Sequence, residues 1–409
     1  MGEFRSITVL ATFLASSLLG RADDWPVYRG PQHNGVTAES GWTQQWPDQG
    51  PKIAWKATVG LGFSSMVVGG GRLYSVGHAN EADTIYCLNA ETGKEIWKHS
   101  YPADIGAKYY EGGTTGTPTI EGDRVYWLSK WGDLFAFEAA TGKILWNSQV
   151  QKETGIRVPD WGFTGAPFIF KDLLILNMGE TGVAINKNTG KVAWRSADKN
   201  AGYSTPVPLA GGAEPLVVLG SAQGYVAVNP ATGKEVWRIK WLTEYGVNAA
   251  DPIVAGDKLF ISTGYGKGAG LFDLTQNPPK SVWTSKVLRT QLNPGVLFEG
   301  HVYAMDGDTG DKGPFKCVEV ATGKEKWAER GFGTGGVILA DGKLVALSAS
   351  GELFVAPASP ERFKPSARAQ VLGGKCWTAP VLANGRIYCR NSRGEIVCVD
   401  VRKETVAAK

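Results

Sequence analysis

The sequence Thr-Gly-Lys-x-x-Trp occurs five times along the chain, ending at Trp97, Trp146, Trp194, Trp237 and Trp327. Two weaker copies end at Trp55 and Trp283, so that 42 to 49 residues separate neighbouring tryptophans. A period of this length is typical of one supersecondary unit that is repeated around or along an axis. It matches the length of a propeller blade, and it constrains the architecture much more than the chemistry.

Each repeat carries the signals of four antiparallel strands. Residue pairs such as Gly122-Asp123 and Asn384-Gly385 accept the positive φ of a tight hairpin turn. The segments 124–128 and 134–137 are rich in the branched and aromatic residues that favour strands. We therefore predict an all-β fold, an eight-bladed β-propeller of four-stranded antiparallel blades that spans residues 52–401.

The last repeat indicates how the ring closes. Residues 380–401 contain three strands and lack a tryptophan strand, whereas residues 52–56 contain such a strand without the rest of a blade. Pairing the two would remove the exposed sheet edges that invite aggregation. We expect the N-terminal strand to close the ring, with residues 23–51 as an N-terminal extended segment and 402–409 as a C-terminal tail.

The N-terminus predicts export. Arg5 precedes an apolar run over residues 7–19, and a small-x-small sequence follows at residues 20–22. This is the pattern of a signal peptide, here residues 1–22, and the run is too short for a stable membrane span. We expect a periplasmic or secreted monomer without a transmembrane segment after cleavage. The formal net charge of +4 comes without basic clusters, so no nucleic-acid partner is expected.

The five cysteines are few for an exported disulfide scaffold. Cys87, Cys317 and Cys398 occupy one repeat position, which sister repeats fill with alanine, so a small buried side chain is expected there. Cys389 and Cys398 flank the hairpin at residues 393–394. Their spacing allows a cross-strand disulfide in an oxidising compartment.

Residues 88–97, Leu-Asn-Ala-Glu-Thr-Gly-Lys-Glu-Ile-Trp, resemble the tryptophan-docking repeat of the pyrroloquinoline quinone (PQQ) propeller superfamily. Residues 25–31, Trp-Pro-Val-Tyr-Arg-Gly-Pro, resemble the opening of secreted bacterial PQQ-like repeat proteins. The resemblance implies an eight-bladed propeller of one of two kinds, a quinoprotein dehydrogenase or a non-catalytic propeller such as the lipoprotein of the outer-membrane β-barrel assembly machinery. The chain lacks the adjacent cysteine pair and the Cys-x-x-Cys-His haem motif of the dehydrogenases, and the anchoring cysteine of the lipoprotein.

The loops that lead into the inner strands of a propeller open around its central funnel, and function is expected on them. Here they carry many aromatic and carboxamide side chains, in residues 62–65, 109–113, 160–163, 202–205, 245–251, 291–293 and 375–378. Such a set suits a flat aromatic ligand, a sugar or a peptide. The alternative is that these side chains fill the funnel.

A quinone cofactor would need an aromatic floor, a cation with oxygen ligands and a carboxylate base. Trp161, Trp377 and Tyr203 are candidates for the floor. Glu111, Asn248, Asp251 and Asn293 are candidate ligands of Ca²⁺, and Glu111 and Asp251 are candidate catalytic residues. As a pair, these two carboxylates would also suit a carbohydrate-active propeller if they lay close together.

A second metal hypothesis concerns Asp306, Asp308 and Asp311, which stand in a glycine-rich loop in the way that Ca²⁺ loops present oxygen ligands. A solvated turn explains the same pattern. The sequence as a whole favours a non-catalytic scaffold that binds an unknown protein or small molecule at its funnel face. The alternative is a small PQQ- and Ca²⁺-dependent alcohol or sugar dehydrogenase.

Overall fold

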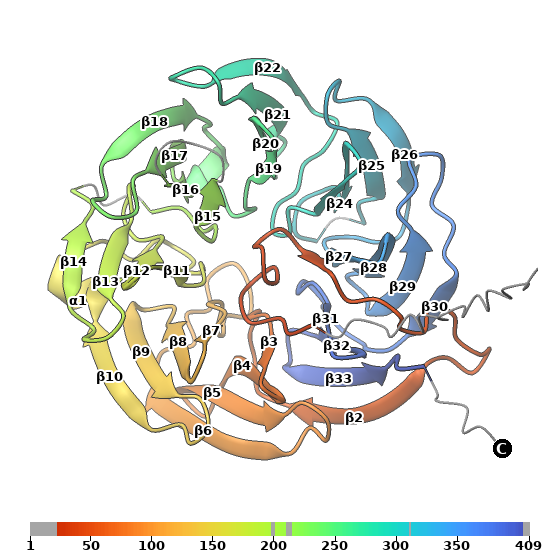
Figure 1. Ribbon diagram of the computed structural model, residues 1–409, viewed down its shortest axis with the longest axis horizontal. Coiled ribbons are helices and arrows are strands. Elements are labelled where there is room, and N and C mark those ends of the chain that lie inside the picture. The colour runs from red at the N-terminus through yellow and green to blue at the C-terminus, as the bar shows by residue number, and fades with distance from the viewer. Residues whose placement is uncertain (1–22, 198–200, 210–214, 311, 404–409) are drawn as a thin grey trace, which may run out of the picture.

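The computed structural model describes residues 23–197, 201–209, 215–310 and 312–403. Over these residues the chain forms eight β-sheets arranged as blades around a central axis (Figure 1). The predicted eight-bladed propeller is therefore confirmed. The predicted signal peptide and most of the predicted C-terminal tail lie outside the described residues.

The first four blades follow one another along the chain. Blade 1 contains β3 (Val67–Gly69), β4 (Arg72–Ala79), β5 (Ala82–Asn89) and β6 (Glu95–Pro102). Blade 2 contains β7 (Thr119–Glu121), β8 (Arg124–Leu128), β9 (Asp133–Glu138) and β10 (Ile144–Gln149), followed by the short helix α1 (Val150–Thr154). Blade 3 contains β11 (Phe168–Phe170), β12 (Leu173–Leu176), β13 (Val183–Asn186) and β14 (Val192–Arg195). Blade 4 contains β15 (Val207–Leu209), β16 (Leu216–Ser221), β17 (Gly224–Val228) and β18 (Glu235–Lys240), followed by the 3₁₀ turn η1 (Glu244–Gly246).

The other four blades complete the circle. Blade 5 contains β19 (Ile253–Ala255), β20 (Lys258–Thr263), β21 (Gly268–Asp273) and β22 (Lys280–Ser285). Blade 6 contains β23 (Val296–Phe298), β24 (His301–Met305), β25 (Phe315–Glu319) and β26 (Glu325–Glu329). Blade 7 contains β27 (Gly336–Ala340), β28 (Lys343–Leu347), β29 (Glu352–Pro357) and β30 (Ala367–Gln370). Blade 8 contains β31 (Val381–Ala383), β32 (Arg386–Arg390), β33 (Glu395–Asp400) and, from the N-terminus, β2 (Lys52–Thr58).

The repeated tryptophans lie on the outermost strands and reach across to the next blade. We call them the outer ring: Trp55, Trp97, Trp146, Trp194, Trp237, Trp283 and Trp327. The indole Nε1 of Trp97 donates to the carbonyl of Ala139 at 3.0 Å, and Trp55 makes the same bond to Ala90 at 3.1 Å. The ring also covers the glycine of the neighbouring Thr-Gly turn. A Cβ on Gly142, which has φ +73°, would lie 2.6 Å from the Trp97 ring, so the position requires glycine.

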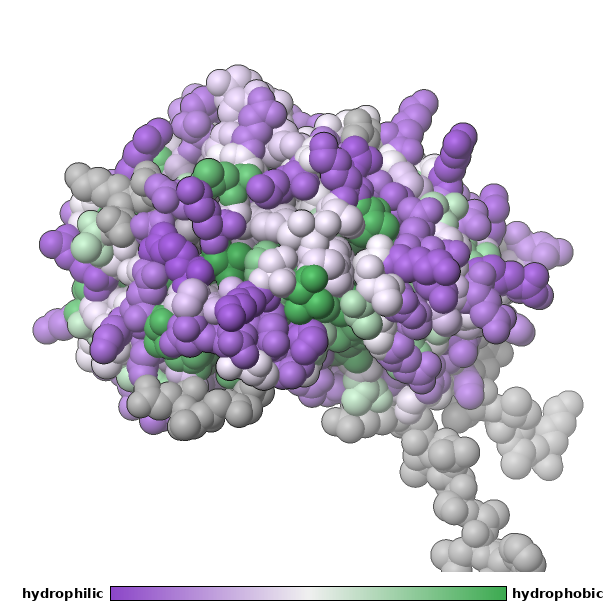
Figure 2. Space-filling model, turned by 90° about the horizontal axis from the view of Figure 1, so that it is seen from above, coloured by the Kyte–Doolittle hydropathy of each residue, from purple (hydrophilic) through white to green (hydrophobic). Residues whose placement is uncertain are grey.

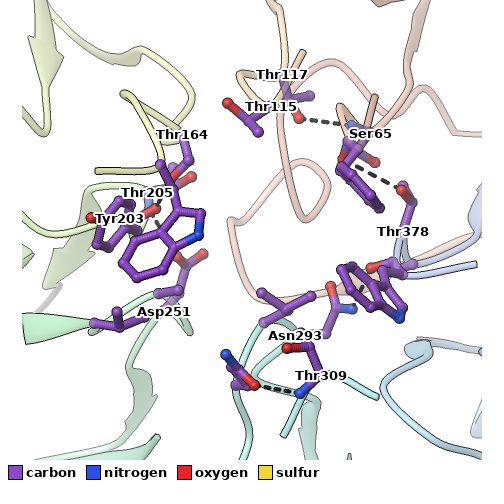
Figure 3. A pocket seen from close by; sticks show the side chains of 18 of the residues that line it. Ser65, Thr115, Thr117, Thr164, Tyr203, Thr205, Asp251, Asn293, Thr309 and Thr378 are labelled. Atoms are coloured by element: carbon purple, nitrogen blue, oxygen red, sulfur yellow. Dashed lines mark hydrogen bonds between the residues drawn. The ribbon is translucent and has the colours of Figure 1, made fainter. Parts of the chain in front are cut away.

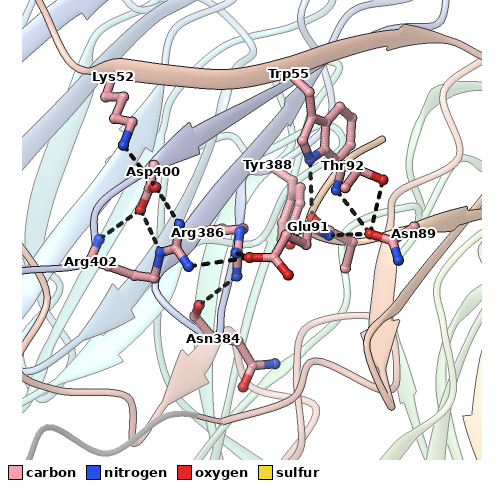
Figure 4. A network of polar contacts seen from close by, with 11 residues as sticks. Lys52, Trp55, Asn89, Glu91, Thr92, Asn384, Arg386, Tyr388, Asp400 and Arg402 are labelled. Carbon is pink, nitrogen blue, oxygen red and sulfur yellow. Dashed lines mark hydrogen bonds and ion pairs between the residues drawn. The ribbon is translucent and has the colours of Figure 1, made fainter. Parts of the chain in front are cut away.

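Ring closure follows the predicted pairing of the two chain regions. β2 runs antiparallel to β33, with Lys52 opposite Asp400 and Thr58 opposite Glu395. Figure 4 shows the polar contacts at this junction, where Glu91 of blade 1 pairs with Arg386 of blade 8 at 2.8 Å. Closure therefore covers the outer edge of β33 and gives blade 8 its fourth strand.

A buried arginine joins the closed blade to its neighbour. Arg390 on β32 is fully buried, and its guanidinium donates to the carbonyls of Ser64 and Gly60 and to the hydroxyl of Ser75. Burial lowers the pKa of Arg390 to about 9. The hydrogen bonds with blade 1 offset the cost of burying this charge.

The N-terminal segment is more than a lead-in to the ring. Figure 1 shows it crossing the ring to the central axis. Trp25 is buried and exchanges two backbone hydrogen bonds with Val68 in the middle of β3, and the carbonyl of Pro26 accepts from the N–H of Ile120 on β7. Further along, β1 (Val36–Thr37) adds a parallel fifth strand to β27, which the sequence did not predict. The segment therefore covers the end of the channel opposite the funnel loops.

The cysteine predictions have two outcomes. Cys87 lies opposite Trp97 and Cys398 opposite Trp55, both fully buried, as the small-residue interpretation expects. The disulfide that the spacing allowed is not formed, because Cys389 and Cys398 are both free. Cys389 lies opposite Val397, one register position from Cys398, and neighbouring strand positions point to opposite faces of the sheet.

The side of the molecule shown in Figure 2 is mainly hydrophilic, with hydrophobic residues in small separate groups. The exposed aliphatic residues of the chain include Ile96 and Leu145, which stand next to outer-ring tryptophans in the sequence and are 45% and 42% exposed. Scattered exposed aliphatic residues are normal for a soluble surface. None of the helices among the described residues has the length and apolar character needed to cross a bilayer.

Candidate functional site

The innermost strands present one repeated position to the central axis. It is the residue two positions before the inner strand begins, and we call the residues at this position in the seven blades other than blade 7 the inner ring: Ser65, Thr117, Ala166, Thr205, Asp251, Pro294 and Ala379. Three pairs of neighbouring members are joined by the same kind of hydrogen bond. The backbone N–H of Ser65 donates to Thr117 Oγ1, that of Ala166 to Thr205 Oγ1, and that of Thr205 to Asp251 Oδ1.

Above this ring the funnel loops enclose a cavity of about 260 Å³ (Figure 3). Each of the seven loop segments identified in the sequence contributes to its lining, so their side chains leave a central space and do not fill the funnel. Eight of the lining residues are aromatic: Tyr28, Phe63, Tyr109, Tyr110, Trp161, Tyr203, Tyr265 and Trp377. Six more are threonines.

The floor of the cavity comes from the N-terminal segment. Tyr28 lines the cavity from this side, and Arg29 lies beside it, held by bonds from its Nη2 to the carbonyls of Asn34 and Gly295 at 2.8 and 2.9 Å. Arg29 is only 9% exposed, and its Nε and Nη1 atoms form no hydrogen bond with the described residues. Burial lowers the pKa of Arg29.

Asp251 is the carboxylate of the cavity wall. It is 5% exposed, and its Oδ1 accepts from the N–H of Thr205 at 2.8 Å, its one hydrogen bond with the described residues. Burial raises the pKa of Asp251 to about 6, although the positive charge of Arg29 and the bond from Thr205 act in the opposite direction. The carboxyl group thus titrates near neutrality, as groups at functional sites often do.

Tyrosines surround the mouth of the cavity. Tyr109, Tyr245 and Tyr265 have φ of 65°, 62° and 52°, a conformation that bulky residues rarely adopt outside strained or functional segments. Tyr109 and Tyr245 are 84% and 69% exposed. The mouth therefore presents aromatic rings to solvent at a cost in backbone strain.

A buried lysine fixes the loop that carries Tyr109. Lys130 Nζ donates to the carbonyls of Ile105 and Gly106 at 3.2 and 3.0 Å and to the hydroxyl of Tyr110 at 2.7 Å. Burial lowers the pKa of Lys130 to about 8. The ion pair between Lys108 and Asp160, at 2.8 Å, joins the same loop to the next one.

The structure separates the predicted site residues into two groups. Trp161, Tyr203, Asp251, Asn293 and Trp377 all line the cavity. In Figure 3, Asp251 and Asn293 come from different sides of the cavity.

Glu111 and Asn248 lie outside the lining. Glu111 pairs with Lys375 at 2.6 Å; burial opposes its ionisation, but the bond from Lys375 lowers the pKa below its usual value. Asn248 is fully buried and donates to the carbonyls of Ser221 and Trp241 at 2.8 and 3.1 Å, so it shapes its loop from within. The predicted carboxylate pair of Glu111 and Asp251 therefore does not share the cavity.

The aspartate-loop metal hypothesis stays a prediction, because one of its three residues is not described. Asp306 is buried between two cations, with Arg289 at 3.1 Å and Lys316 at 3.0 Å, and Asp308 accepts from the backbone N–H of Tyr265. Asp311 lies outside the described residues. Within the described ranges, no group of three or more His, Cys, Asp and Glu is placed to hold a metal ion.

Sequence reasoning missed Tyr28 and Arg29, because nothing in a repeat pattern predicts that a segment outside the repeats reaches the axis. A signal for Asp251 was present. Aligning the repeats on their prolines places Thr117, Thr205 and Asp251 at one position, where a single member is charged.

The comparisons with known proteins agree with this architecture. The family model described as "Outer membrane protein assembly factor BamB" matches residues 36–161 and 109–329, which is more than half of the chain. The chain belongs to this PQQ-like β-propeller family. No curated protein sequence matches it.

Solved structures from two branches of the family share the fold. BamB from Moraxella catarrhalis is 17% identical, with 86% of this chain and 99% of that chain covered at a TM-score of 0.63. A europium-containing methanol dehydrogenase is 14% identical, with 92% and 89% covered at 0.68. A quinohemoprotein alcohol dehydrogenase from Comamonas testosteroni is 15% identical, with 94% and 82% covered at 0.67. At these identities the likeness establishes the fold alone.

The cavity of this family member does not fit PQQ well. Trp161 and Trp377 would suit a flat ring system, but PQQ carries three carboxylate groups. Among the described residues that line it there is no Lys, Arg or His to balance these charges, and the single carboxylate, Asp251, would repel them. A multiply charged anion would enter this cavity at a large desolvation cost.

Proposed function

We propose that this chain is an exported propeller that binds a small organic ligand, or a side chain of a protein partner, in its central cavity and performs no redox chemistry. The observation that carries the proposal is the lining itself, with eight aromatic residues, one carboxylate and no basic side chain. Concave, mostly apolar sites with a few placed polar groups are typical of ligand pockets. Export rests on the signal pattern of residues 1–22.

The competing function is a PQQ-dependent dehydrogenase, and it is favoured by the fold of the methanol and alcohol dehydrogenases. A direct comparison separates the two. Protein comprising residues 23–409 is incubated with PQQ and Ca²⁺, and in parallel with PQQ and Eu³⁺. It is then passed through a desalting column and assayed for dye reduction with methanol, ethanol and glucose.

We expect the cofactor to be lost on the column and no dye to be reduced. Retention of PQQ together with turnover would overturn the proposal. Binding itself is measured by tryptophan fluorescence with a set of small organic ligands, using Trp161→Ala as the cavity variant and Ile96→Ala, an exposed position on β6, as its control. We expect ligands to change the fluorescence of the parent and the control, and to lose affinity for Trp161→Ala.

A further inference from the structure

The polar groups of the cavity wall are mostly engaged with the protein itself. The hydroxyls of Thr115 and Thr164 donate to the carbonyls of Phe163 and Tyr203 on the next blade. Asn293 Nδ2 donates to the carbonyls of Gly335 and Trp377 at 2.9 and 2.8 Å. A ligand therefore meets aromatic ring faces and the Asp251 carboxylate more than open hydrogen-bonding groups. This argues against a sugar, whose many hydroxyls each need a partner.

The inner ring does not require a charged residue at the position of Asp251. At the equivalent position Thr117 and Thr205 accept the same backbone hydrogen bond with a neutral hydroxyl. Asp251 adds a charge that is costly to bury and that no neighbouring cation pairs at short range. Arg29 acts on it through the floor, but no ion pair within 4.0 Å joins the two among the described residues.

These features together specify the charge of the ligand. Aromatic ring faces attract cations, and the attraction strengthens when the cation is desolvated. A carboxylate that lines a cavity with one hydrogen bond is a counter-charge for such a group. We propose that the cavity binds an organic cation, a protonated or quaternary amine on an apolar or aromatic body, with its charge against Asp251.

This inference rests on the proposed function and narrows its ligand. The cation could be a free amine or the side chain of a lysine in a partner, since both offer the same chemistry. Titration calorimetry with three cations separates these sources: tetramethylammonium, 2-phenylethylamine and Nα-acetyl-lysine methylamide. The matched neutral and anionic probes are 2-phenylethanol and phenylacetate.

We expect 2-phenylethylamine to bind at least about tenfold more tightly than 2-phenylethanol, and phenylacetate to bind least. Asp251→Asn keeps the acceptor for Thr205, and Asp251→Thr restores the side chain used at other inner-ring positions. Both should lose most of the preference for the amine. Glu111→Gln removes a carboxylate that does not line the cavity, and this variant should keep the preference for the amine.

The affinity for the amine should also fall as pH drops from 7.5 to 5, because the Asp251 carboxyl becomes protonated while the amine stays charged. The groups that act on Asp251 from neighbouring elements are Arg29 and the phenols of Tyr28 and Tyr225, which stay in one protonation state over this range.

Equal affinity for 2-phenylethylamine and 2-phenylethanol would overturn the cation while leaving a ligand cavity in place. Absence of binding by all three cations would overturn the inference outright. Retention of PQQ with turnover is a separate result. It would overturn the proposed function, on which this inference rests.

Discussion

The outer and inner rings of this propeller are built from the same repeats but have diverged to different degrees. In the outer ring, seven blades keep the tryptophan, six of these indoles donate to a backbone carbonyl of the next blade, and five cover a glycine there. In the inner ring the repeated hydrogen bond joins only three pairs of neighbours, and the residues include serine, threonine, alanine, aspartate and proline. The repeated contacts of the outer ring therefore indicate that it stabilises the fold. In the inner ring the residue that departs from the pattern, Asp251, is where we expect a ligand to bind.

The largest effect is expected in the outer ring. Trp97→Ala should lower the free energy of unfolding by about 3–5 kcal/mol, because it empties the space beneath Gly142 and removes the bond to Ala139. Denaturant unfolding measures the change. Ile96→Ala, one residue earlier and exposed, should change stability by less than about 0.5 kcal/mol. Similar losses for the two variants would contradict a stabilising role of the ring.

The second prediction has the opposite sign and concerns Asp251. Its pKa rises from 3.8 to about 6 on folding, so the folded protein binds the extra proton between these values and loses stability as pH rises through this window. Above pH 6 the ionised carboxylate should lower the free energy of unfolding by about 3 kcal/mol, whereas below pH 4 the protonated group should not lower it. Asp251→Asn should therefore stabilise the protein at pH 8 and leave it unchanged near pH 4.

Thermal or denaturant unfolding at the two pH values tests this difference. A variant that is destabilised at pH 8 would show that the carboxylate serves the fold, and the distinction between the two rings would fail at this position.

The smallest change in stability is expected at the inner-ring threonines, whose hydroxyls accept the repeated backbone hydrogen bond. Thr205→Val deprives the N–H of Ala166 of its acceptor and should cost about 1 kcal/mol. Thr117→Val deprives Ser65 in the same way and should match it. Unequal losses measured by the same unfolding experiment would mean that the ring bonds are not equivalent.

The fold could be predicted because its signals are local and repeated. A Thr-Gly turn followed by a tryptophan predicts both the positive φ of the glycine and the contact of the indole with the next blade. Each further copy of the motif strengthens this prediction. The closing strand could be predicted for the same reason, because residues 52–56 contain the tryptophan strand of a repeat without the other three strands of a blade.

The site was only partly predictable. Trp161, Tyr203, Asp251, Asn293 and Trp377 were found because funnel loops are defined by the repeat, whereas Asn248 differs from its cavity-lining neighbours Val247 and Ala249 only in the direction of its side chain. Tyr28 and Arg29 had no signal, because their position depends on contacts between segments far apart in sequence.

The covered end of the channel determines how a molecule can be recognised. With Trp25 through Arg29 lying across the axis, a long polymer has no route through the hub of the ring. Whatever enters must leave by the same opening, and it must stop at Tyr28. If the cavity binds a ligand as proposed, it contacts only the end of that molecule, whatever the length of the part that stays in solvent.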